Sequence, residues 1–578
     1  MILSNEIIDS YICCKYKAFL IINGNRGNKP DYDLVENRLC KIYRDNFFEH
    51  IKKSYHEGQI LTSIQITKTQ SDSTIIINPE AKGNDFSVNF DAIEISSTRT
   101  GRKRKTYIPI IISPKEAVTK NEKVLLTVKT LLLNRVSSHL TEIGRIIYGK
   151  DSKTCCIKIK DYKRTSQRML DELEILMRDN DKPLVYKNGN CQICEFEKNC
   201  RKHLIEKDDL SLLGSFSLKE IIKRNKKGVF TINQLSYNFR PKKFRKTRER
   251  GRPFSYELKA LAIRDKKTYV LNSPIESKPS KDDIYIDFEG LPDEKFVYLI
   301  GIVIKSNGSE KEVVYYSFWA DSKKHEKIIF QNLLKTISRY DDYAIYHYGS
   351  YEAKELKRVS RDYPELENLI TSKILQNSVN LLSHFYSNIY TPTFTNGLKD
   401  IGSFLGFKWS ADNSSGIQSI AWRKNWELSN EDEYKEILLK YNSEDCNALI
   451  IVKEWIDKLR AGKTSAINNA VGCVDEIKHQ SSYKFGKTEF LIPDFEAINN
   501  CGYFNYQREK VFIKTNLKIK KIIRKQNLLN KPKKAIRPNV YINLPTPKQC
   551  LNCGNKKLYR HRNCYAIRET STGNNGNN

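Results

Sequence analysis

A short apolar segment that ends in two carboxylates constrains the fold of this chain most. Residues 284–288 read Ile-Tyr-Ile-Asp-Phe, and Glu289 and Gly290 follow. The β-branched and aromatic residues predict a strand, and the glycine predicts a turn directly after it. Side chains two residues apart share one face of a strand, so we expect Asp287 and Glu289 side by side. Paired hard oxygen ligands suit Mg²⁺ or Mn²⁺, and an exposed acidic strand end is the alternative interpretation.

Two later segments supply further candidate side chains for the same site. Residues 343–348 predict a short apolar strand, after which Glu352 opens a helix. Residues 434–455 predict one helix with a continuous apolar stripe. On that helix Tyr441 and Asp445 lie four residues apart and therefore share a face. If these segments pack against the first strand, their polar side chains form one site.

The acid pair, the acid after a strand and the Tyr-x-x-x-Asp helix, in this order, resemble the DnaQ-like 3′–5′ exonucleases of the RNase H-like superfamily. The resemblance is to the type that uses four acids and a tyrosine, and it implies hydrolysis of phosphodiester bonds with two metal ions. Glu352 stands where that family usually has aspartate, and His347 where it usually has asparagine. The catalytic residues implied are Asp287, Glu289, Glu352, Tyr441 and Asp445. Of these, Asp287, Glu289 and Asp445 would hold the Mg²⁺ or Mn²⁺ ions, and Tyr441 would orient the attacking water.

The length of the chain predicts several domains, because 578 residues are too many for one hydrophobic core. We expect an α/β multidomain protein. Its predicted parts are a first domain over residues 1–205, a helical and basic linker over 206–255, an RNase H-like mixed-sheet domain over 256–465 and a basic tail over 466–578.

The formal net charge of +31 indicates a polyanionic partner, and we expect nucleic acid, DNA rather than RNA. A general enrichment in lysine is the alternative explanation. No segment approaches the ~20 apolar residues of a membrane span, and residues 1–8 lack the basic region of a signal peptide. The 14 cysteines are clustered, which without a secretion signal indicates metal ligands in a reducing compartment. We therefore expect a cytoplasmic protein with no membrane partner.

One cysteine cluster closes the first predicted domain. Cys191, Cys194 and Cys200 have the spacing C-x2-C-x5-C, and Cys14 lies far upstream before a Lys-Tyr-Lys sequence. This arrangement resembles the RecB-like nucleases of the PD-(D/E)XK type that carry an iron–sulfur cluster, among them a group fused to an RNase H-like half. The resemblance covers roughly Met1 to Trp455 and implies that these four cysteines hold a [4Fe–4S] cluster. A zinc site or unligated thiols are the alternatives.

RecB-like nucleases cut with an acid on one strand and Glu-x-Lys on the next. Residues 86–95 predict the first of these strands, with Asp91 in the matching place. On the next predicted strand, Ile111 and Ser113 stand where the glutamate and the lysine are expected. Isoleucine cannot ligate a metal and serine cannot replace the lysine, so we expect this half to bind DNA without cutting it. Lys129, on the helix that follows, is expected on a solvated face or in contact with DNA.

Two basic regions complete the sequence. Residues 240–252 are rich in arginine and lysine with aromatic neighbours, which is typical of a nucleic-acid contact or of a disordered linker. The residues expected to contact nucleic acid are Arg240, Lys242, Lys243, Arg245, Lys246 and Arg248. Near residue 550 the spacing C-x2-C-x7-H-x2-C resembles a zinc knuckle or part of a transposase-type zinc ribbon. It implies Zn²⁺ held by Cys550, Cys553, His561 and Cys564, with a surface histidine as the alternative for His561.

These patterns together predict a metal-dependent nuclease. The leading interpretation is a 3′–5′ exonuclease that hydrolyses single-stranded DNA ends in the RNase H-like domain, while the RecB-like half binds DNA. A catalytically inactive nucleic-acid-binding adaptor and a transposon-associated accessory factor are the alternatives. The joint presence of two strand carboxylates and a Tyr-x-x-x-Asp helix favours the enzyme.

Overall fold

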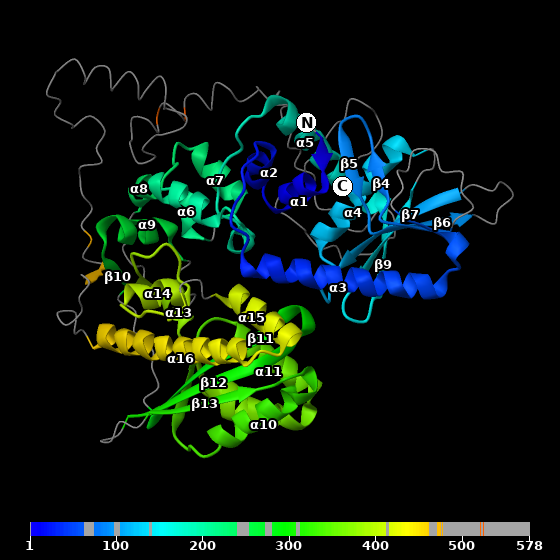
Figure 1. The fold of residues 1–578 in the computed structure, drawn as a ribbon. Coiled ribbons are helices and arrows are strands. Elements are labelled where there is room, and N and C mark those ends of the chain that lie inside the picture. The colour runs from blue at the N-terminus through cyan, green and yellow to red at the C-terminus, as the bar shows by residue number, and fades with distance from the viewer. Residues whose placement is uncertain are drawn as a thin grey trace, which may run out of the picture. The chain divides into compact units, whose positions relative to one another are not determined.

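The computed structural model describes residues 2–62, 74–97, 105–137, 141–214, 216–239, 254–271, 280–307, 313–411, 415–461, 471–474, 477, 521 and 524. The chain divides into two compact units, Met1–His479 and Gln480–Asn578. The elements below all belong to the first unit (Figure 1). In the described part of the chain, no helix has the length and apolar character needed to cross a membrane.

The N-terminal part of this unit contains a six-stranded sheet, a three-stranded sheet and helices. Its strands are β1 (Leu3–Ser4), β2 (Ile60–Thr62), β3 (Ile75–Ile77), β4 (Glu80–Lys82), β5 (Phe86–Asn89), β6 (Ala92–Ser97), β7 (Lys105–Ser113), β8 (Ile143–Tyr148) and β9 (Lys153–Lys158). Its helices are α1 (Asn5–Cys13), α2 (Lys15–Ile22), α3 (Asp31–Ser54), α4 (Lys120–Val136) and α5 (Ile159–Asp179). The sheet order is β2-β3-β6-β7-β8-β9. Successive β7 residues alternate between the two cores: Ile111 packs with α4 and α5, and Ile110 and Ile112 pack with α3.

The single strand expected over residues 86–95 is wrong. The chain forms β5, which pairs in a small sheet of order β1-β5-β4, and then β6 in the six-stranded sheet. Asp91 lies in the break between the two strands. Val88, Phe90 and Ile93 all pack in the same core. The residues that face this core therefore change from even-numbered to odd-numbered positions at this point. One strand with a period of two cannot place all three residues on one face, so the chain changes sheets.

A small helical layer follows, built around its own apolar core. It consists of η2 (Cys191–Ile193), α6 (Glu197–Glu206), η3 (Leu210–Leu213), α7 (Leu218–Asn225), α8 (Ile232–Ser236) and α9 (Tyr256–Asp265). Helices α7 and α8 each begin with a capping box, formed by Ser217 with Glu220 and by Thr231 with Gln234. Phe394, which lies much later in the sequence, packs against the core of this layer. The layer therefore continues into the last part of the unit.

The last part of the unit is a five-stranded mixed sheet of order β13-β12-β11-β14-β15. Its strands are β11 (Asp282–Leu291), β12 (Phe296–Ser306), β13 (Val313–Trp319), β14 (Tyr343–His347) and β15 (Ser378–Asn380), and a small sheet beside it contains β10 (Thr268–Val270), β16 (Ile389–Tyr390) and β17 (Val471–Cys473). Its helices are α10 (Glu326–Ile337), α11 (Tyr351–Asp362), α12 (Glu367–Leu369), α13 (Leu382–Ser387), α14 (Leu398–Phe404), α15 (Gly416–Ser429) and α16 (Asp432–Arg460). β11 to β13 are antiparallel, and β14 and β15 run parallel to β11.

Helix α16 lies along one face of this sheet and α10 on the other (Figure 1). Strand β11 alternates between them, because Ile286 and Phe288 pack with α10 while Tyr285 packs with α16. By the same period, Asp287 and Glu289 point to the face that α16 covers. The helix comes close to the sheet at Gly301 of β12, where a Cβ would overlap the side-chain oxygen of Asn442 on α16.

The turn expected directly after Glu289 is wrong. Strand β11 continues through Gly290 to Leu291, with a β-bulge between Glu289 and Gly290. Glycine at position 290 lets the Tyr351 side chain come close to the strand, because a Cβ here would overlap the Tyr351 hydroxyl. The bulge shifts the register of β11 on β12 immediately after the second carboxylate.

Candidate metal centre

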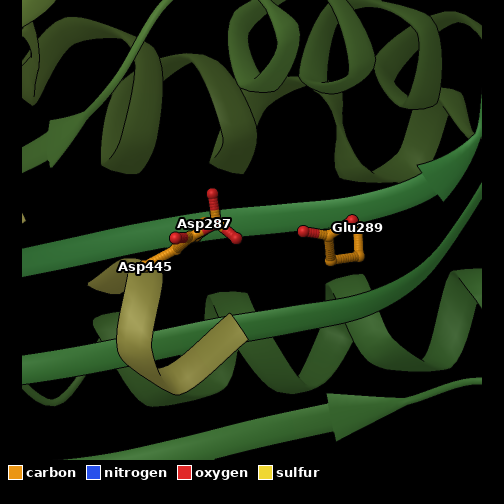
Figure 2. Close-up of side chains that lie close together, drawn as sticks. All are labelled: Asp287, Glu289 and Asp445. Carbon is orange, nitrogen blue, oxygen red and sulfur yellow. The ribbon is translucent and has the colours of Figure 1, made fainter. Parts of the chain in front are cut away.

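Three carboxylates converge between β11 and α16. Asp287 and Glu289 come from the strand and Asp445 from the helix (Figure 2). One oxygen from each of the three lies within 4.8 Å of the other two, and among the described residues this is the one group of three acids, histidines or cysteines that meets this limit. The convergence of the acid pair and the helix acid, which the spacing alone could only suggest, is therefore present in the fold.

Glu289 and Asp445 are buried and Asp287 is partly buried, and the negative charges of the cluster repel one another. Burial raises the pKa of Asp287, and the negative charges of Asp445, Glu289 and Glu352 raise it further. Burial also raises the pKa of Glu289 to about 8 and, in the same direction, the pKa of Asp445. Carboxylates in such a place are ionised only when a cation compensates them. Buried hard oxygen donors at this spacing fit Mg²⁺ or Mn²⁺.

Each carboxylate is oriented by a hydrogen bond from a side chain that the sequence patterns did not indicate. Asn442 Nδ2 donates to Asp287 Oδ2 at 2.7 Å. The indole nitrogen of Trp409 donates to Asp445 Oδ1 at 2.6 Å, and the hydroxyl of Ser419 donates to Glu289 Oε2 at 2.6 Å. Trp409 precedes α15 and Ser419 lies on it, so both come from a segment for which no pattern was available. Each of these donors engages one oxygen of its carboxylate.

Lys399, on α14, supplies a positive charge at the edge of the cluster. Its ammonium nitrogen lies 4.3 Å from the ring centroid of Tyr441 and 5.0 Å from that of Trp409. Burial lowers the pKa of this lysine, and the charges of Asp445, Glu289 and Asp287 oppose that change. A cation here can contact a phosphate that approaches the carboxylates.

Tyr441 lies within the site, as its position one helical turn before Asp445 predicted. The side chain is 4% exposed and packs edge-on against Trp422 with 5.9 Å between ring centroids. Burial raises its pKa well above the ordinary value, and Glu289, Asp445 and Asp287 add to this. Its hydroxyl hydrogen bonds to Asp445. The phenol is therefore protonated and held beside the carboxylates.

Glu352 lies near the cluster but outside the group of three. It opens α11, is 4% exposed, and its charge raises the pKa of both Asp287 and Glu289. Its Oε2 atom lies 3.4 Å from Nδ1 of His347, which is equally buried. Neither of these two atoms has a hydrogen-bond partner among the described residues. The pair thus presents unused polar atoms on the side of the site formed by β14 and α11.

The four cysteines expected to hold a cluster come together in the helical layer and α2. Cys14 separates α1 from α2, Cys191 and Cys194 flank η2, and Cys200 lies on α6. Burial raises the pKa of Cys200 to about 12, and the charges of Cys194, Cys14 and Cys191 raise it further. Within the described residues, no three of the sulfurs lie within 4.8 Å of one another. Around one tetrahedral zinc ion, sulfurs that lie 2.3 Å from the metal are about 4 Å from one another.

The carboxylate of Asp91 is paired with a cation from the chain itself. Arg44 Nε lies 2.6 Å from Oδ1, and the backbone N–H of Ile112 donates to Oδ2 at 2.7 Å. Ser113 is buried and its hydroxyl donates to Glu122, part of the capping box of α4. The expected solvated or DNA-contacting position of Lys129 is wrong. This side chain is 7% exposed and donates to the carbonyl of Asn89 at 3.1 Å.

Two predicted groups of site residues lie outside the described residues. They are the basic residues Arg240, Lys242, Lys243, Arg245, Lys246 and Arg248, and the expected zinc ligands Cys550, Cys553, His561 and Cys564. Both groups remain predictions.

Comparison with protein families finds a match for the part of the chain that carries the carboxylates. A family model of the RNase H superfamily matches residues 284–457, which run from β11 into α16. No curated protein matches the chain. The match covers the mixed sheet and all three acids, and nucleases of this fold use divalent metals. Residues 284–457 are thus an RNase H-like domain of the nuclease type, with nucleic acid as its partner.

Proposed function

We propose that this protein is a metal-dependent exonuclease that removes nucleotides from the 3′ ends of single-stranded DNA. One observation carries the proposal: carboxylate oxygens of Asp287, Glu289 and Asp445, from β11 and α16, lie within 4.8 Å of one another in an RNase H-like domain. Three uncompensated negative charges in a buried space are unfavourable, so the arrangement favours a function that requires bound cations.

Each residue of the site has a separate role in phosphodiester hydrolysis. Asp287, Glu289 and Asp445 would hold two Mg²⁺ or Mn²⁺ ions, which when bound stabilise charge on the attacking and leaving oxygens. Tyr441, protonated and hydrogen bonded to Asp445, orients the attacking water. Lys399 attracts the phosphate to the edge of the cluster.

Glu352 is proposed as the fourth acid of the site. Its carboxylate faces the cluster closely enough to raise the pKa of Asp287, yet its Oε2 atom has no hydrogen-bond partner among the described residues. A buried acceptor without a donor is costly unless a cation or a water completes it. The glutamate side chain is longer than that of aspartate. The extra length suits Glu352, because its helix α11 carries none of the other three carboxylates.

The N-terminal part is proposed to bind DNA without cutting it. The Arg44 guanidinium occupies the place beside Asp91 where a metal would be needed, and Ile111 is part of the apolar core. Cys14, Cys191, Cys194 and Cys200 are proposed to hold a [4Fe–4S] cluster, because the charges of the other three act on the Cys200 thiol. The zinc site near residue 550 and a cytoplasmic location belong to the same proposal.

Digestion of end-labelled DNA tests this function. The wild type should release nucleotides from the 3′ end of a single strand with Mn²⁺ or Mg²⁺ and be nearly inactive in EDTA. Asp287→Asn should slow release by about 10²-fold or more, because a loss of several kcal/mol in metal-assisted stabilisation corresponds to that factor. Tyr441→Phe should lose less, and Glu352→Gln should fall between the two.

Asp432→Asn is the matched control, since this acid lies exposed at the start of the same helix as Asp445. It should retain the wild-type rate. Equal activity of the wild type and Asp287→Asn would refute the exonuclease and leave a nucleic-acid-binding adaptor or accessory factor in its place. Products of internal cleavage, or digestion from the 5′ end, would keep the nuclease and refute its proposed direction.

A further inference from the structure

A cavity of about 770 Å³ lies where the helical layer meets the RNase H-like domain. Its volume falls in the ~300–1,000 Å³ range of small-molecule pockets, which is enough for a nucleotide. Aromatic rings and a lysine dominate its wall: Tyr186, Lys187, Phe216, Phe254, Tyr386 and Phe394. No aspartate or glutamate is among the described residues that line it. The cavity is thus aromatic and cationic, although it belongs to the same unit as the acidic cluster.

Two segments connect this cavity to the carboxylates. Gly397 lines the cavity, and Lys399, two residues later at the start of α14, faces the acids. On the other side, Tyr348 donates from its hydroxyl to the carbonyl of Asn396 at 2.6 Å. Tyr348 lies between His347 and Glu352, so the loop that carries the proposed fourth acid also holds the cavity wall. A strand that occupied the cavity would be led to the metal centre.

The wall that contains Asn396 is fixed by a buried lysine. Lys259 on α9 is 2% exposed and donates to Thr391 at 3.0 Å, to Thr393 at 3.1 Å and to Asn396 at 2.7 Å. These three bonds use all the donors of the ammonium group. The wall is therefore preorganised, which reduces the entropy lost when a ligand binds.

The rings are arranged to offer a stacking surface. Phe254 stacks on Tyr390 with 5.1 Å between centroids and 16° between planes. Tyr386, on α13, also lies 5.1 Å from Phe254 but remains 43% exposed. The ring of Tyr386 is tilted by 58° to that of Phe254, and a half-exposed tyrosine held by a neighbouring ring can stack against a flat ligand.

We propose that this cavity binds the unpaired bases of the DNA strand whose end lies in the metal centre. Bases stack on aromatic side chains whatever their identity, and a lysine beside them binds the backbone phosphate. A purely apolar ligand fits less well, because the wall carries Lys187 and none of its described residues is an acid that could pair with it. This inference rests on the proposed nuclease function and extends it by a second, base-binding subsite. Duplex DNA is excluded as the ligand, since its bases are stacked on one another.

The subsite is tested by binding of a 12-nucleotide single strand that carries 2-aminopurine near its 3′ end. The protein is the full chain with Asp287→Asn, and EDTA is present so that the strand is not cleaved. Stacking should quench the fluorescence of the base. Tyr386→Ala should weaken binding by about 5-fold to 100-fold, the loss expected for one stacked base. Lys187→Gln should weaken it less, and Tyr386→Phe should retain the wild-type affinity. Tyr315→Ala is the control, because this tyrosine is 54% exposed on β13 and does not line the cavity.

An abasic strand of the same length separates stacking from phosphate contact. It should bind more weakly than the normal strand and equally well to the wild type and Tyr386→Ala. Equal affinity of all variants for the normal strand, an equal effect of Tyr386→Ala on the abasic strand, or binding of duplex as tight as that of single strand would overturn the subsite.

Cleavage of a dinucleotide and of the 12-nucleotide strand is a second readout, in the chain with an intact Asp287. Tyr386→Ala should raise the KM of the longer substrate and leave the dinucleotide unchanged. Equal effects on both lengths would overturn the proposal. The two proposals fail separately: base-dependent binding without any cleavage refutes the nuclease alone, and cleavage with no base-dependent binding refutes the subsite alone.

Discussion

Removal of the metal is expected to make the RNase H-like domain less stable as the pH rises. In the folded, metal-free chain, burial raises the pKa of Glu289 from 4.5 to about 8. Between these two pH values the folded state keeps the proton and the unfolded state releases it, so stability falls with increasing pH. A difference of about 3.5 units corresponds to about 5 kcal/mol at 1.36 kcal/mol per unit. The loss begins above about pH 4.5 and is complete once the pH exceeds about 8.

Tryptophan fluorescence offers an assay that reports this domain alone. All five tryptophans of the chain lie between Trp319 and Trp455. In EDTA, the melting temperature followed at these residues should fall by about 7–14 °C from pH 5 to pH 8, because about 3.5 of the 5 kcal/mol is lost in this interval and a domain of this size loses ~2–4 °C per kcal/mol. Saturating Mg²⁺ or Mn²⁺ should abolish most of the decrease, because bound cations stabilise the ionised carboxylates.

Glu289→Gln isolates the contribution of the carboxylate. Lys399 acts in the opposite sense, since burial lowers its pKa, and the wild-type slope therefore combines several groups. The glutamine variant should lose part of the decrease in EDTA, because burial also raises the pKa of Asp287 and Asp445, and it should gain less from metal. A melting temperature in EDTA that is flat or rises between pH 5 and pH 8, or the same slope in Glu289→Gln, would refute the reasoning from buried, mutually repelling acids.

Two further predictions concern the N-terminal part. Asp91→Ala should leave the rate of DNA cleavage unchanged, because this carboxylate is paired with Arg44. A clear loss of rate in a folded, DNA-binding variant would show that a second active site had been missed. Anaerobically purified protein should be brown with absorbance near roughly 400 nm, as iron–sulfur charge transfer requires. Cys194→Ser should bleach it and lower the melting temperature, and stoichiometric zinc without iron in the wild type would contradict this.

The sequence was sufficient to predict the elements in which one periodicity prevails. The expected helix over residues 434–455 lies within α16, and the strand expected over residues 343–348 is β14, which ends one residue earlier. The strand that carries Asp287 and Glu289 also follows one periodicity. The sequence underestimates its length, because Gly290 indicates a turn where the strand continues to Leu291. A glycine demanded by a neighbouring side chain, here the Tyr351 hydroxyl, cannot be told from a turn glycine without the partner.

The site was predictable only where its residues repeat a spacing. Asp287 with Glu289, and Tyr441 with Asp445, follow the periods of a strand and a helix. Trp409 and Ser419 reach the same carboxylates from a loop and from α15, and nothing in their local sequence marks them. Long-range hydrogen bonds of this kind depend on how the layers pack, which local periodicity does not encode.

The order of the elements has a consequence for the newly made chain. Asp287 lies on the first strand of the five-stranded sheet, whereas Asp445 lies on α16, which follows all of its strands. At roughly 5–20 residues per second, a ribosome adds Asp445 about 8–30 seconds after Asp287. A nascent chain that ends before α16 holds two carboxylates without the third, without Tyr441 and without Asn442. The site is thus incomplete until α16 has been made.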